Sequence, residues 1–208
     1  MSIPVNTNGD TSFWNKYQSE KFAEIGLSNL AQSRDSLILR ISTEIQSIEI
    51  RTTNFETFSG KIYNFTKKVS LNPDQQSKEV QNKWLSNKTA IKPTTARQVY
   101  ELSKKLSIDT IPSEEQIKRW PIGADGMSYI IEYATPSTYS FKSYWEPSTS
   151  RYTLKEAAAI DNFTKELKAT LELYTCFDTF INSLPAGTYH AGGILAITTT
   201  KKRLWKRR

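Results

Sequence analysis

Cys176 and His190 are the only thiol and the only imidazole in the chain, so a cysteine–histidine pair of nucleophile and base would have to use them. A cysteine nucleophile needs a base such as histidine in the same cleft. Cys176 falls beside the apolar stripe of a predicted helix, where a free cysteine usually packs as a small hydrophobic side chain. We therefore predict that this pair is not catalytic, and the sequence indicates no catalytic residue.

Metal and cofactor sites are also disfavoured. One histidine and one cysteine leave only carboxylates as further metal ligands. The chain lacks the glycine-rich phosphate-binding, dinucleotide-binding and nucleophile-elbow motifs. We expect no metal and no cofactor. Glu114 and Glu115 fit the first turn of a helix, and Glu44 and Glu49 fit solvated strand faces. An acid–base site made of scattered carboxylates stays open, because the sequence does not show which of them are neighbours.

The basic charge is concentrated in one short segment. Six of the 28 Lys and Arg residues lie at positions 201–208, which leaves only +1 of the net charge of +7 for the rest of the chain. Such a run can contact phosphates, and a tryptophan within it can stack on a base or lie at a membrane interface. The alternative is a solvated end without a ligand. The predicted polyanion-binding residues are Lys201, Lys202, Arg203, Trp205, Lys206, Arg207 and Arg208.

The composition is that of one globular domain. Of the 208 residues, 38% are hydrophobic and 12% aromatic, which is enough for a single sizeable core. The sequence shows no signal-peptide pattern and no apolar run long enough to span a membrane. We expect a cytoplasmic protein, or a periplasmic or exported one if a signal peptide has been removed. The oligomeric state is not predicted.

The spacing of apolar residues divides the chain into a disordered N-terminus (1–12), a single α+β domain (13–198) and the basic tail (199–208). Within the domain, a helical segment is interrupted near Gly26, and three runs with a period of two predict an antiparallel meander. A polar insertion at 68–93 is expected to be a surface excursion or partly helical. The remaining elements are a helix at 94–106, a hairpin at 123–147, a long helix at 153–184 and a short final strand at 192–198. Together they predict an α+β fold in which an antiparallel sheet of about five strands, meander plus hairpin, is covered on one face by helices.

The hairpin at 123–147 is the most regular part of the sequence, and its charges suggest a register. Pairing Glu132 with Lys142 makes a cross-strand ion pair on a solvated face. The same register puts Trp145 on the opposite face, against the long helix. We therefore expect a large loss of stability, about 3–5 kcal/mol, from Trp145→Ala, and well under about 1 kcal/mol from Glu132→Ala.

The hairpin also carries a resemblance to a known type of domain. Its sequence, together with the preceding strands and the following helix, resembles a small, mostly uncharacterised bacterial α+β domain that is often found in exported proteins or lipoproteins. The resemblance covers roughly residues 36–173 and implies a fold but no activity. This chain departs from the pattern because it lacks an export signal and carries the insertion and the tail. The matching residues are Trp120, Asp125, Gly126, Tyr129, Glu132, Tyr139, Trp145 and Pro147.

The sequence favours a non-enzymatic interaction module that binds a protein partner. The predicted contact is an exposed aromatic patch on the open face of the sheet, near Ile130 and Tyr144. The alternative is a polyanion binder, for a nucleic acid or an anionic membrane surface, that uses the basic tail. A third hypothesis is an enzyme, which would need two acids with perturbed pKa values in one deep pocket.

Overall fold

The computed structural model describes residues 20–30, 33, 35–69, 84–123 and 125–199. The predicted disordered residues 1–12 and the basic residues 201–208 lie outside this part. Residues 20–24 form a helical turn. The elements that follow are β1 (Leu37–Ser42), β2 (Gln46–Thr52), β3 (Phe58–Val69), β4 (Trp84–Ile91), α3 (Pro93–Lys105), η3 (Glu114–Gln116), β5 (Ser128–Ala134), β6 (Tyr139–Trp145), α4 (Pro147–Ser150), α5 (Lys155–Thr170), α6 (Leu173–Ser183), β7 (Gly187–His190) and β8 (Leu195–Thr198).

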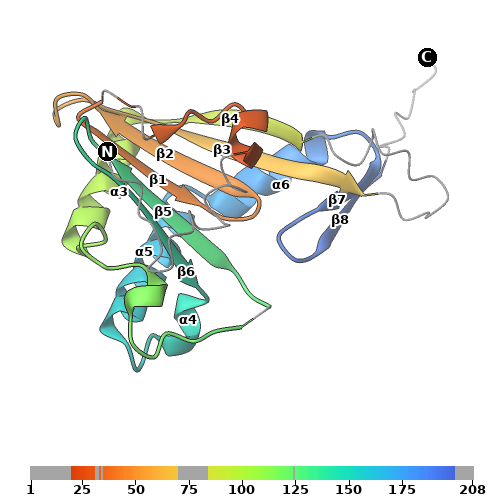
Figure 1. Cartoon of the computed structure of the whole chain (residues 1–208). Helices are drawn as coiled ribbons and strands as arrows, with labels where there is room; N and C mark the ends of the chain where they lie inside the picture. The colour runs from red at the N-terminus through yellow and green to blue at the C-terminus, as the bar shows by residue number, and fades with distance from the viewer. Residues whose placement is uncertain (1–19, 31–32, 34, 70–83, 124, 200–208) are drawn as a thin grey trace, which may run out of the picture.

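The strands form one antiparallel sheet, and the fold class is α+β as predicted. The strand order is β6-β5-β1-β2-β3-β7-β8, and β4 also pairs with β3 (Figure 1). The meander β1–β2–β3 and the hairpin β5–β6 are the five strands predicted for the sheet, and β8 lies within the predicted final strand at 192–198. The sheet is larger because β4, β7 and β8 extend it beyond β3.

Part of the predicted polar insertion is a strand. Residues 84–91 were expected in a surface excursion or a partly helical segment, but they pair with β3 from Gly60 to Lys67. The side chains of this strand are mostly exposed, so its sequence lacks the apolar alternation of a half-buried strand. Pairing with a long neighbour, β3, decides its conformation.

The predicted long helix is two helices. α5 ends at Thr170 and α6 begins at Leu173, because Glu172 adopts a left-handed backbone conformation with a φ of 48°. The apolar spacing continues across this break, which is why the sequence reads as a single helix.

The main core lies between one face of the sheet and the helices α3 and α5. Apolar side chains of β1, β2 and β5 meet Ala96 and Val99 of α3 and Ile160 and Phe163 of α5. All four of these helical side chains are fully buried. This face is the covered face that the sequence predicted.

The register of the hairpin β5–β6 differs by one residue from the predicted register. Glu132 lies opposite Phe141, and Lys142 lies opposite Ile131. The tight turn fixes this pairing, because the Thr135 amide donates to the Thr138 carbonyl and Ala134 therefore faces Tyr139. A shift of one residue turns every β6 side chain to the other face of the sheet.

The predicted positions of two β6 residues are consequently wrong. Tyr144, rather than Trp145, enters the helix-side core, where it is fully buried and donates a hydrogen bond of 3.1 Å to the Ile111 carbonyl. Trp145 is half-buried on the other face. The larger loss of stability should therefore follow Tyr144→Ala.

The second face of the sheet is also covered in part. The segment 20–30 lies over it and buries Phe22, Ile25, Leu27 and Leu30. Its helical turn ends at Gly26, where a φ of 76° allows the Leu27 amide to donate to the Phe22 carbonyl at 2.8 Å. This Schellman-type end turns the chain so that its apolar residues face the strands.

A buried ion network lies beneath the segment 20–30. Arg40 is 1% exposed and lies opposite Glu49 on β2 and Glu132 on β5. Its guanidinium donates to Glu49 Oε2 at 2.6 Å and to Glu132 Oε2 at 3.4 Å. It also donates to the Ser28 carbonyl at 2.7 Å, and Tyr139 donates to Glu132 Oε1 at 2.8 Å. One guanidinium thus joins three strands and the covering segment.

This network corrects two predictions. Glu132 is 4% exposed and pairs with Arg40, whereas Lys142 donates to the Asp109 carbonyl at 2.7 Å. Glu49 is 3% exposed and does not lie on a solvated face. Burial raises the pKa of Glu132. Burial acts on Glu49 in the same direction, but Arg40 and Arg51 outweigh it and lower the pKa of Glu49.

Arg40→Met should lower the free energy of unfolding by about 3–5 kcal/mol at neutral pH, because it leaves two buried carboxylates without their cation. Acidification should reduce this loss. Between pH 7 and pH 5 the wild type keeps the stabilisation from Glu49, because the lowered pKa of this group puts its loss at lower pH, whereas the variant gains when its unpaired buried carboxyl groups are protonated.

Urea unfolding at pH 7 and pH 5 measures both effects. Arg97→Met, at an exposed position on α3, is the matched control and should change stability by less than about 1 kcal/mol. An Arg40→Met chain that unfolds like the control would contradict the structural role of the network.

Lys21 is buried on the same face of the sheet. It is 5% exposed, and its ammonium lies 4.4 Å from the centre of the Phe65 ring and 5.5 Å from that of Trp84. It donates to the carbonyls of Thr43 and Glu44 at 3.4 Å. Burial lowers its pKa to about 8, with a further lowering from Lys67 and a partial offset from the Glu44 carboxylate.

The burial of Lys21 makes stability depend on pH. Between about pH 8 and pH 10.5 the unfolded chain holds the Lys21 proton and the folded chain has lost it, so the free energy of unfolding rises with pH. The difference between wild type and Lys21→Met should shift in favour of the wild type by about 1–2 kcal/mol from pH 7 to pH 9.5. Paired urea melts measure this difference, and a flat or falling difference would show that the folded chain keeps the proton.

Candidate functional site: a tryptophan pocket beside the hairpin

The free edge of β6 is capped by side chains of the preceding segment. Ser113 Oγ accepts the Ser143 amide at 3.0 Å, and Glu114 Oε2 accepts the Trp145 amide. Glu114 Oε1 also accepts the Ser143 hydroxyl at 3.0 Å. These bonds satisfy groups that an edge strand otherwise exposes, and they hold η3 against the end of the hairpin.

Two tryptophans meet at this end of the hairpin. Trp120 follows η3 and donates from Nε1 to the Trp145 carbonyl at 2.9 Å. The Trp145 ring lies over Gly123 so closely that a Cβ there would be 2.3 Å from the ring, so only glycine fits. Trp145 Nε1 is buried and has no hydrogen-bond partner among the described residues.

The tryptophans border a cavity of about 520 Å³, which we call the tryptophan pocket. Its volume is typical of ligand sites. Its strand side is formed by outward-facing residues at the ends of β1, β5 and β6, and its other walls come from the β1–β2 turn and the segment 114–123. The residues that border it are Ser42, Thr43, Glu44, Glu114, Glu115, Ile117, Arg119, Trp120, Pro121, Ile122, Gly123, Ser128, Ile130, Ser143 and Trp145.

The pocket is acidic and partly apolar. The wall contains one arginine, Arg119, and three glutamates, which are Glu44, Glu114 and Glu115. The charged residues of the wall therefore sum to a negative charge. Ile122 is 99% exposed at the rim. Carboxylates beside tryptophan faces are the surroundings that an ammonium or guanidinium group prefers.

The acids of the pocket are poorly suited to acid–base catalysis. Burial raises the pKa of Glu114, and Glu115 adds to this rise, while hydrogen bonds from Trp145 and Ser143 lower it. Both oxygens of Glu114 accept hydrogen bonds from the fold, and Glu115 Oε2 accepts the Ser113 hydroxyl at 2.6 Å. The lone pairs of Glu114 therefore hold the hairpin edge, whereas Glu115 is exposed and, among the described residues, is bonded only to Ser113.

The residues predicted for partner binding lie differently from the prediction. Ile130 and Tyr144 are 5% and 0% exposed, so they form no exposed aromatic patch, and they point to opposite faces of the sheet. Ile130 does line the tryptophan pocket. Sequence reasoning missed Trp120, Glu114 and Glu44 as pocket residues, although Trp120 is one of the residues that carry the resemblance to the bacterial domain.

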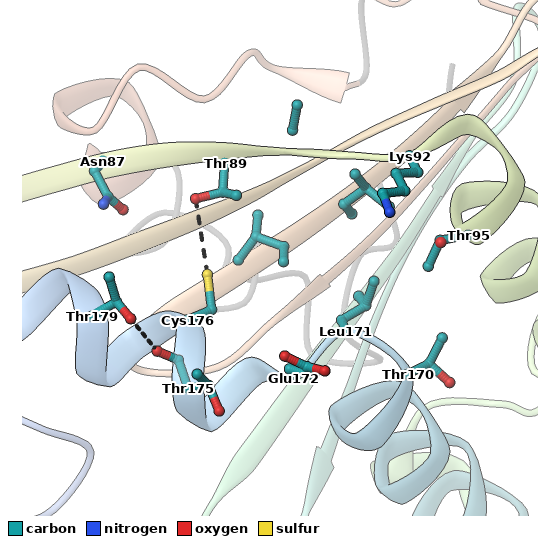
Figure 2. A pocket seen from close by; sticks show the side chains of 13 residues that line it. Asn87, Thr89, Lys92, Thr95, Thr170, Leu171, Glu172, Thr175, Cys176 and Thr179 are labelled. Carbon is teal, nitrogen blue, oxygen red and sulfur yellow. Dashed lines mark hydrogen bonds between the residues drawn. The ribbon is translucent and has the colours of Figure 1, made fainter.

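A second cavity, the threonine groove, lies between β4 and the start of α6 (Figure 2). It has a volume of about 460 Å³ and is bordered by several threonines and Cys176. Cys176 Sγ points toward Thr89 across the groove, and the buried Asn64 amide donates to the sulfur at 3.4 Å. His190, which is exposed at the end of β7, does not border the groove. The groove thus offers a thiol without a base.

Among the described residues, no three His, Cys, Asp or Glu side chains are grouped closely enough to hold a metal ion. None of the described helices is long and apolar enough to cross a membrane.

Glu114→Ala should lower the free energy of unfolding by about 1–3 kcal/mol, because it leaves the Trp145 amide and the Ser143 hydroxyl without their acceptor. Glu115→Ala, at the exposed neighbouring position, should change it by less than about 1 kcal/mol. Thermal or urea melts of the two variants compare these losses. Equal losses would mean that Glu114 does not hold the strand edge.

The sequence matches no family model, and no curated protein or solved structure gives a significant match. The resemblance to a bacterial α+β domain therefore stays a prediction, and the function has to be inferred from the site.

Proposed function

We propose that this chain is a non-enzymatic binding module whose tryptophan pocket takes a basic residue of a segment from a protein partner. The observation that carries the proposal is the pocket itself, a cavity of about 520 Å³ that combines Trp120 and Trp145 with three glutamates. A lysine or arginine side chain suits it, because its methylenes pack on apolar walls while its charged end reaches carboxylates.

The composition of the walls supports recognition of a protein segment. Tryptophan is enriched at the energetic centres of protein interfaces, where a few anchored side chains provide most of the affinity. Ile122 at the rim and Ile130 on the floor offer apolar contact beside the charges. A partner segment with a cation next to an apolar residue would use both.

The binding role is also supported by the state of the pocket's polar groups. Glu114 is committed to the edge of β6, which places a half-buried negative charge in the wall at a fixed position. Glu44 and Glu115 are exposed, so they can approach a ligand without disturbing the fold. A fixed charge with two adjustable neighbours suits binding better than proton transfer.

Selection of random 12-residue peptides against the full-length chain tests the proposal. Enriched peptides should carry Lys or Arg next to a large apolar residue. Their dissociation constants should rise about tenfold or more in the double variant Glu44→Gln/Glu115→Gln, which removes two charges from the pocket wall. Raising the salt concentration should weaken binding in the same direction.

The matched control is Glu101→Gln/Glu166→Gln, which removes two exposed charges from α3 and α5. This control should bind the peptides within about twofold of the wild type, since the removed charges are remote and screened. Enrichment of acidic peptides, or equal weakening by both double variants, would refute the pocket as the binding site.

A further inference from the structure

The basic tail of this same chain has the chemistry that the tryptophan pocket favours. We propose that residues 201–208 bind in the tryptophan pocket of their own chain, so that a partner segment must displace them. This inference rests on the proposed function, because it names the regulator of the same site. The tail holds six basic residues around Leu204 and Trp205 and no acid.

Charge complementarity is the first argument. The rest of the chain has a net charge of only +1, so the general field of the molecule neither attracts nor strongly repels the tail. The tryptophan pocket offers Glu44, Glu114 and Glu115 against Arg119, which is a local excess of negative charge. An ammonium of the tail can lie over a tryptophan face while it pairs with these carboxylates.

Reach is the second argument. The loop between β7 and β8 lies beside the pocket, because Gly192 and Gly193 border a smaller hollow together with Thr43 and Glu44. β8 then runs away from this loop for four residues, over about 10 Å. The eight Cα-to-Cα steps from Thr198 to Lys206 can span at most about 28 Å, so the tail can return along β8 and still reach the pocket.

The surface along that return path is the third argument. β8 is the last strand of the sheet, so one edge of it is unpaired within the described residues. Leu195 and Ile197 are 48% and 70% exposed on this strand, and the neighbouring Ile194 is 69% exposed. Exposed apolar residues on a free edge favour the approach of another segment of chain, and the tail is the nearest one in sequence.

Zero-length carbodiimide cross-linking of the full-length chain tests the proposal directly. Lys201, Lys202 or Lys206 should become linked to Glu44 or Glu115, and these links should be lost in Glu44→Gln/Glu115→Gln. A mixture of ¹⁴N- and ¹⁵N-labelled chains shows whether each link joins one copy or two. Links spread over remote acids such as Glu101 and Glu166, or links found only between two copies, would overturn binding within one chain.

A competition experiment gives the functional result. The probe is a synthetic peptide with the sequence of residues 201–208, and the second protein is a full-length variant in which the six tail Lys and Arg residues are changed to Ser. The peptide should bind this variant about tenfold or more tightly than the wild type, because the wild-type pocket is already occupied. Equal affinity for both proteins would refute occupation by the tail.

These outcomes separate the inference from the proposed function. In one outcome, selected peptides bind in the pocket while the wild type and the tail variant bind the tail peptide with equal affinity. This result would refute only the occupation of the pocket by the tail. If the tail is cross-linked to the pocket acids but no selected peptide loses affinity in Glu44→Gln/Glu115→Gln, only the binding of a partner segment is refuted. A third outcome is that the full chain is retained on heparin equally with and without Glu44→Gln/Glu115→Gln, and that no links to the pocket acids form. This outcome would support the polyanion-binding alternative and overturn the inference.

Discussion

One buried guanidinium sets the arrangement on which the rest of this structure depends. Arg40 lies on β1 between Glu49 and Glu132, and all three side chains are almost fully removed from water. An unpaired charge in such a place is very costly, so the three residues must lie opposite one another on adjacent strands. The same guanidinium holds the Ser28 carbonyl, so the covering segment is positioned by the same group.

The network also determines which side chains reach the tryptophan pocket. Tyr139 donates to Glu132, which fixes the face of β6 on which Tyr139 lies. Alternate residues share a face, so Trp145 must lie on this same face and Tyr144 on the helix side. Trp145 is therefore available to border the pocket with Trp120. The ion network, which lies outside the pocket, and the turn at 135–138 thus favour the same register, and this register shapes the site.

The sequence predicts the elements of this fold better than their register. Alternating apolar residues identify β1, β2, β3 and the hairpin, and the α+β class follows from their order. The exposed strand β4 lacks that alternation, and the break at Glu172 depends on one backbone conformation that apolar spacing does not encode. Both charge pairs, Glu132 with Lys142 or with Arg40, fit the local pattern, and only the long-range pairing of β1 with β5 decides between them. The pocket could not be predicted, because its walls combine residues 42–44 with residues 114–145, which lie 70 positions or more further along the chain.

The most direct test of the account is an NMR titration of the tryptophan side chains in the full-length chain. The indole N–H signals can be assigned by single Trp→Phe variants, and the ligand is an excess of the peptide Gly-Lys-Lys-Leu-Phe-Lys-Gly. The signals of Trp120 and Trp145 should shift, whereas that of Trp84, which lies on β4 against Phe65, should stay in place. A titration that moves the Trp84 signal and leaves Trp120 and Trp145 unchanged would contradict the pocket as the binding site.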